Sequence, residues 1–135
     1  MELNFDINWL AAIVGAVAAF IVGSVWYSPV LFSRIWQQEV KLTDADIRAG
    51  NMAVTFGSAF VLTLIGAILL AAYLGPEPEL GDALIAGLVV GAGFISTAIG
   101  VVYLFERRSM TLFLINAGYQ IATYLVIGLI LGLWK

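Results

Sequence analysis

Four long stretches without a charged residue constrain the fold of this chain more than any other feature. They cover residues 8–27, 52–74, 83–105 and 110–134. A helix of about 20 residues is long enough to cross a hydrocarbon core about 30 Å thick. A segment in lipid must also satisfy its backbone hydrogen bonds internally, as a helix does. Each stretch is therefore expected to be a transmembrane helix.

The composition supports this fold class. Hydrophobic residues make up 62% of the chain and charged residues 11%, whereas soluble domains have about 45–50% apolar and about 25% charged residues. The 135 residues leave room for one domain once four spans are placed. We therefore expect residues 1–135 to form a single all-α domain, a four-helix transmembrane bundle with a short cytoplasmic interfacial helix. The expected spans are about 8–28, 52–74, 83–105 and 110–134.

The segment between the first two spans is expected to hold the interfacial helix, at about 29–40. Ser28 is a suitable N-cap, and Pro29 is favoured in a first turn. The apolar residues of this helix then share one broad face. They are Leu31, Phe32, Ile35 and Trp36. Thr43 is a second suitable cap, followed by two aspartates where the helix dipole favours negative charge. The second span is therefore expected to begin in water, near Asp44.

Basic residues near the spans indicate the orientation, because lysine and arginine are retained on the cytoplasmic side. Five of the six basic residues lie in the two loops on one side, and Lys135 alone lies on the other. The five are Arg34, Lys41, Arg48, Arg107 and Arg108. Both termini are expected outside. The residues before the first span include Glu2 and Asp6 but no basic residue, unlike a secretory signal, so this stretch is expected to be retained.

Most site chemistry is excluded by what the chain lacks. It has no cysteine or histidine, which removes thiolate chemistry and the usual zinc and haem ligands. No acidic or basic residue lies within a span, so no acid–base group is expected at the bilayer centre. No nucleophile–base pair and no basic stripe can be assembled. We therefore expect no enzymatic activity, cofactor, metal or nucleic-acid partner, and the lipid bilayer as the immediate partner.

Neutral polar residues recur at helical spacing along the second and fourth spans. They are Asn51, Thr55 and Ser58 in the second span, and Asn116, Gln120 and Thr123 in the fourth. Each triplet falls on one helix face, and both helices run in the same direction, so the two faces are expected to start at similar depths and to meet. Tyr119, beside Gln120, and Tyr27, at the end of the first span, complete this candidate site.

Two interpretations of this polar seam stay open. Hydrogen bonds between spans contribute about 0.6–2 kcal/mol each, so these groups can serve only to fasten the helices. The alternative is that Asn116, Tyr119, Gln120 and Thr123 line a cavity or pathway for a small neutral or amphiphilic molecule.

Small residues at four-residue spacing form a second pattern. They are Gly15, Ala19 and Gly23 in the first span, Gly87 and Gly91 in the third, and Gly128 and Gly132 in the fourth. Such residues let helix backbones approach closely. In the first and third spans they are expected to pack inside the bundle, whereas the pair in the fourth span can instead face a second copy. A homo-oligomer is therefore expected. The matching triplets also leave open a tandem repeat of two helical hairpins.

Three motifs carry a resemblance to a known family. They are Asn8-Trp9-Leu10-Ala11, Trp26-Tyr27-Ser28-Pro29 with Leu31-Phe32, and Asn116-Ala117-Gly118-Tyr119-Gln120. In these motifs, and over nearly its whole length, the chain resembles the small bacterial membrane proteins of domain-of-unknown-function family 1761. The resemblance implies a multi-pass protein of the bacterial inner (plasma) membrane, and it implies no activity.

The sequence thus favours an integral membrane protein that binds or passes a small neutral or amphiphilic molecule at the polar seam. The competing class is a structural or accessory subunit that acts through helix packing and oligomerisation, without a ligand. A continuous polar cavity from Gln120 to Tyr27 would favour the first class, and a fully packed seam would favour the second.

Overall fold

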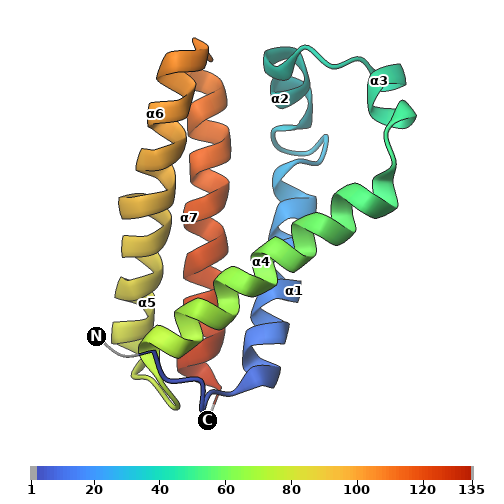
Figure 1. The fold of residues 1–135 in the computed structure, drawn as a ribbon. Coiled ribbons are helices and arrows are strands. Elements are labelled where there is room, and N and C mark those ends of the chain that lie inside the picture. Colours follow the sequence, from blue (N-terminus) through green and yellow to red (C-terminus); the bar gives the residue numbers. More distant parts are fainter. Residues whose placement is uncertain (1–2, 135) are drawn as a thin grey trace.

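The computed structural model describes residues 3–134, which fold into a bundle of helices (Figure 1). The first half of the chain forms α1 (Trp9–Trp26), α2 (Ser33–Val40), α3 (Asp44–Ala49) and α4 (Met52–Leu74). The second half forms α5 (Leu80–Leu88), the π-helical segment η1 (Val89–Ile95), α6 (Ser96–Glu106) and α7 (Met110–Leu133). Since α5, η1 and α6 follow one another directly, they form one rod.

Within residues 3–134, four helical rods are long and apolar enough to cross a membrane, namely α1, α4, the α5–η1–α6 rod and α7. This confirms the predicted all-α architecture with four spans. Figure 1 shows the N-terminal segment, the α4–α5 loop and the end of α7 at one end of the bundle, which we call the terminal end. The helices α2 and α3 and the α6–α7 turn lie at the other end, which we call the loop end.

The helix α7 is central because it packs against both α1 and the α5–η1–α6 rod. Glycines make the contact with the rod possible. A Cβ atom on Gly91 would lie 2.9 Å from the Cα of Ile121, and one on Gly87 would collide with the backbone carbonyl of Tyr124. No larger side chain fits at either position, so the two backbones lie in direct contact.

One face of the α5–η1–α6 rod follows α7 along its length. The residues on this face are Ala83, Gly87, Gly91, Ser96 and Gly100, which meet in turn Gly128, Tyr124, Ile121, Ala117 and Phe113. Their spacing is four residues, except for the step of five between Gly91 and Ser96. That step lies in η1, where the Ser96 hydroxyl donates to the Gly91 carbonyl at 2.6 Å. A π-helical turn accommodates one more residue than an α-helical turn, so the same face stays on α7.

The glycine pair of the last span also lies inside the bundle. A Cβ atom on Gly128 would lie 2.5 Å from the carbonyl oxygen of Ala83, and one on Gly132 would lie 2.8 Å from the Cα of Leu80. Because α5 already occupies this face of α7, the glycine pair does not face a second copy, as the sequence had allowed; it packs inside the bundle.

The buried apolar core lies toward the terminal end and is rich in alanine. Its alanines are Ala11, Ala12, Ala16 and Ala19 of α1, and Ala67, Ala71 and Ala72 of α4. Leu70, Tyr124, Ile127 and Leu131 complete most of the cluster. Small side chains let α1, α4 and α7 approach one another closely here. The backbone amide of Asn4 also donates to the Ala72 carbonyl at 3.0 Å, which fastens the N-terminal segment to α4.

The helix α4 leaves the bundle toward the loop end. Its residues 52–58 are all exposed, and Figure 1 shows α4 crossing the bundle obliquely and diverging from α7. Phe20 and Phe60 form an edge-to-face pair between α1 and α4, with ring centroids 5.4 Å apart. These rings hold the helices apart where the alanines end. The expected meeting of the polar faces of the second and fourth spans is therefore not found.

The connection between α1 and α4 differs from the expected helix at 29–40. The helix α2 begins at Ser33, and residues 27–32 form a turn. The Ser28 hydroxyl donates to the Val25 carbonyl at 2.7 Å, so it closes α1 and caps no following helix. The Phe32 amide likewise donates back to the Trp26 carbonyl at 3.1 Å.

The predicted cap at Thr43 is confirmed as a reciprocal capping box with Asp46. Hydrogen bonds from the backbone and hydroxyl of Thr43 lower the pKa of the Asp46 carboxyl. The short helix ends at Ala49 with Gly50 as its C-cap, and Asn51 caps α4 by accepting from the Val54 amide at 3.2 Å. The second span therefore begins at Met52 and does not continue from Asp44.

Candidate functional site

The polar side chains at the loop end of α1, α6 and α7 bond to one another. The Tyr27 hydroxyl donates to Asn116 Oδ1 at 2.6 Å, and Asn116 Nδ2 donates to the Tyr103 hydroxyl at 2.7 Å. We call these three residues the inner polar cluster. The Tyr27 ring also meets Tyr119 edge to face, with centroids 5.3 Å apart. One amide thus joins three spans through two short hydrogen bonds.

Neighbouring aromatic residues extend this connection. The Trp26 indole Nε1 donates to the Ile115 carbonyl at 2.9 Å, and the Tyr119 hydroxyl donates to the Ala19 carbonyl at 3.3 Å. A Cβ atom on Gly23 would lie 2.8 Å from that hydroxyl, so glycine makes room for Tyr119. These polar groups find protein partners, as groups in hydrocarbon require. The arrangement fastens α1 to α7.

The remaining residues of the predicted seam do not join this cluster. Asn51, Thr55 and Ser58 are exposed on α4. Gln120 is half-buried, and its side chain makes no hydrogen bond within residues 3–134. Thr123 is 3% exposed, and its hydroxyl has no hydrogen-bond partner among the described residues. The structure therefore brings together Tyr27, Asn116 and Tyr119, and it separates the α4 triplet from them.

A large groove lies elsewhere, between the terminal half of α4 and the α5–η1 part of the neighbouring rod. We call it the lateral groove, and its volume is about 860 Å³. Its walls are mainly apolar and include Leu69, Leu70, Ile85, Ala86, Val90 and Phe94. The oblique path of α4 opens this space, because α4 contacts α1 far more than it contacts α5.

Tyr124 of α7 lines the lateral groove from within the bundle. Its side chain is only 9% exposed, and its hydroxyl makes no hydrogen bond within the described part of the chain. A Cβ atom on Gly66 of α4 would collide with that hydroxyl, so glycine creates the space that the ring occupies. The hydroxyl itself stays accessible at the groove, where it can bond to a polar group of a ligand.

Two carboxylates stand where the lateral groove reaches the terminal end. Glu79 and Asp82 both line it, and both side chains are exposed. Neither carboxylate forms an ion pair within residues 3–134. The ion pair found in that range joins Glu106 and Arg108, at 2.8 Å, at the loop end. The groove therefore combines apolar walls, a tyrosine hydroxyl without a protein partner in the described residues and a negatively charged mouth.

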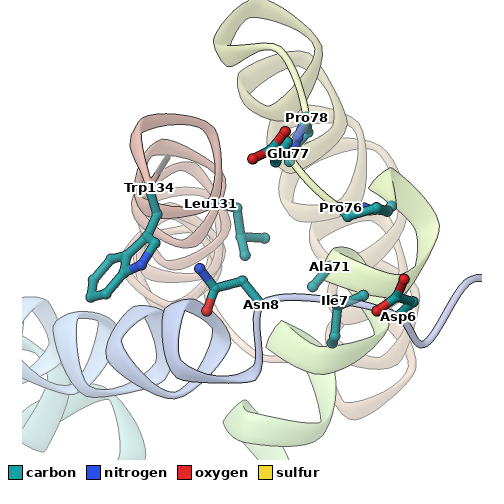
Figure 2. A pocket seen from close by; sticks show the side chains of 10 residues that line it. Asp6, Ile7, Asn8, Ala71, Pro76, Glu77, Pro78, Leu131 and Trp134 are labelled. Carbon is teal, nitrogen blue, oxygen red and sulfur yellow. The ribbon is translucent and has the colours of Figure 1, made fainter.

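A smaller cavity of about 240 Å³ lies at the terminal end of the bundle. Figure 2 shows Leu131 of α7 and Trp134, which follows that helix, on one side of the cavity, Asp6 and Glu77 on other sides, and Asn8 between them. Asn8 caps α1, since its Oδ1 accepts from the Ala11 amide at 3.0 Å. Among the described residues, this cavity shares only Pro78 with the lateral groove.

Sequence reasoning missed Tyr124, Glu79, Asp82 and Gly66. Tyr124 does carry a signal, because it lies in the middle of its span, whereas aromatic residues that anchor a protein in the membrane surface lie near span ends. The role of Gly66 depends on which helix crosses α7 at that depth. Periodicity within one span does not contain this information.

Four apolar rods that enclose an alanine-rich core define the class of this molecule as a multi-pass α-helical membrane protein. The chain belongs to the family described as Protein of unknown function (DUF1761), whose model matches residues 10–132. This confirms the family that the sequence motifs indicated. No curated protein and no solved structure matches the chain.

Proposed function

We propose that this protein binds an amphiphilic molecule in the lateral groove, with the apolar part of the molecule between α4 and α5–η1. The observation that carries the proposal is Tyr124, a residue only 9% exposed whose hydroxyl lies at the groove without a protein partner in the described residues. Apolar walls with a few convergent polar groups are typical of small-molecule sites. The groove also suits a molecule that enters sideways from lipid.

This proposal keeps the class of ligand that the sequence favours, but it places the binding site in the lateral groove and not at the polar seam. The inner polar cluster suits a ligand less well, because Tyr27, Asn116 and Tyr103 already bond to one another. Neither of the two cavities described above is lined by these residues. Gln120 and Thr123 stay predicted ligand contacts of the seam. Basic residues gather at the loop end, which favours a cytoplasmic location for that end and external termini in a bacterial inner membrane.

Filling the groove tests the proposal. Ala86→Phe places a ring between α4 and α5, and it is expected to reduce binding of dodecyl probes at least tenfold. The probes are dodecyl maltoside and dodecyltrimethylammonium. Binding is measured by native mass spectrometry of the full chain in tetraethylene glycol monooctyl ether.

Ala98→Phe is the matched control, since Ala98 is exposed on α6 and does not line the groove. It should bind both probes like the parent protein. If Ala86→Phe leaves the affinity for both probes unchanged while the protein stays folded, the proposed site is wrong.

A second candidate function is a structural subunit that self-associates through the loop-end half of α4. A specific observation favours it, because this half carries exposed Thr55 and Ser58 and stands apart from its own bundle (Figure 1). Nothing lies within 4 Å of the Cβ position at Gly57. A helix with hydroxyl groups and a glycine exposed to lipid is suited to packing against a second copy.

Gly57→Leu is therefore expected to weaken self-association in bilayers at least fivefold, because a branched side chain separates the two α4 helices. Single-molecule photobleaching at graded protein-to-lipid ratios measures the monomer fraction. Ala98→Leu makes the same kind of change on the exposed face of α6 and should have no effect. A parent chain that is monomeric at every ratio contradicts this candidate function.

A further inference from the structure

We infer that the lateral groove selects amphiphiles with a cationic head group. The inference rests on the proposed function, because it assigns the head of the molecule whose apolar part occupies the groove. It depends on the charge at the groove mouth and on the depth of Tyr124.

The charge at the terminal end has one sign in the described residues. The charged residues there are Asp6, Glu77, Glu79 and Asp82. Two of them, Glu79 and Asp82, line the groove itself. The attraction between charges strengthens as the surroundings become less polar, so a cation at the edge of a membrane is held more firmly than in water. The groove mouth is thus complementary to an ammonium group.

The fold does not use both carboxylates for itself. Asp82 lies in the first turn of α5, where the helix dipole favours its ionised form. Glu79 occupies the N-cap position, but its side chain makes no capping hydrogen bond. A helix-stabilising role therefore accounts for Asp82 and leaves Glu79 without a structural task.

The length of the groove fits a single extended chain. The Tyr124 hydroxyl lies against Gly66 of α4, which precedes the end of that helix at Leu74 by eight residues, or about 12 Å of helix. Phe94 lies at the far side, twelve residues from Asp82, or roughly 18 Å along the rod. A head group at the carboxylates thus places the chain past the Tyr124 hydroxyl. Since that hydroxyl is an independent polar feature at depth, it indicates a ligand that extends well beyond the charged mouth.

The test uses two probes that share a dodecyl chain, dodecyltrimethylammonium and neutral dodecyl maltoside. Native mass spectrometry of the full chain gives both affinities. We expect the cation to bind at least tenfold more tightly. The double variant Glu79→Gln with Asp82→Asn should remove this preference and leave the affinity for the maltoside unchanged. Asp6→Asn, which removes a carboxylate of the smaller cavity, is the matched control and should keep the preference.

The outcomes separate the inference from the proposed function. Equal binding of the two probes to the parent chain overturns the inference and leaves a groove without charge selection. Equal loss of preference in Asp6→Asn overturns it as well, because the effect is then one of total surface charge. If neither probe binds, the proposed function fails together with the inference.

Discussion

Gly87→Leu is expected to be among the most damaging single substitutions in this chain, with a loss of about 2–3 kcal/mol in the free energy of unfolding. A Cβ atom at this position collides with the backbone carbonyl of Tyr124, and a backbone atom cannot rotate away as a side chain can. The α5–η1–α6 rod must then move off α7, which separates a contact that extends over several turns. Unfolding in mixed micelles with increasing dodecyl sulfate measures the change.

Gly93→Leu is the matched control for this experiment. Gly93 belongs to the same rod, but it is exposed, and the nearest side-chain atom to its Cβ position is 3.8 Å away. The control is expected to change the free energy of unfolding by less than about 0.5 kcal/mol, as surface substitutions usually do. Equal losses in the two variants would mean that the close approach of the backbones contributes little to stability.

Asn116→Leu is expected to cost about 2–3 kcal/mol, since hydrogen bonds between spans contribute about 0.6–2 kcal/mol each and this residue makes two. The substitution leaves the hydroxyls of Tyr27 and Tyr103 without their partner. Tyr27→Phe removes only one of the two bonds and is expected to cost about 1 kcal/mol. The same unfolding assay measures both.

The double variant shows whether the inner polar cluster acts as a unit. Tyr27→Phe has no further bond to remove once Asn116 is leucine. The loss of stability in the double variant should therefore be smaller than the sum of the losses in the two single variants. Thr97→Val is the control, since Thr97 is exposed and, among the described residues, its hydroxyl bonds only within the α5–η1–α6 rod, to the carbonyls of Gly93 and Phe94. Strict additivity of Tyr27→Phe and Asn116→Leu would contradict a coupled cluster.

The absence of charged residues from the apolar stretches and the length of each stretch were sufficient to predict the four spans. Each apolar stretch is long enough to cross a bilayer, and each is bounded by a proline or by charged residues. The cap at Thr43 was also predictable, because its partners lie within three residues. The start of α2 was not, because Ser28 can bond backward or forward and it bonds backward to Val25.

The candidate site was harder to predict, for a reason that Thr55 and Asn116 illustrate. Helical periodicity indicates which residues of one span share a face, but it does not give the tilt of the neighbouring span. The tilt of α4 is set by Ala67 and Ala71 at one end and by the Phe20–Phe60 pair farther along. Asn116 therefore finds its partners on α1 and α6, while Thr55 lies apart from both.

The five-residue step in η1 sets the rotational phase between the two halves of one span. Gly87, on the half toward the terminal end, lies against the backbone of Tyr124, and Tyr103, on the other half, accepts from Asn116. Each α-helical residue turns the chain by about 100°, so one residue more or fewer in η1 would swing one half around its own axis while the other stayed in place. The number of residues in this single turn therefore fixes the rotation of the lateral groove relative to the inner polar cluster.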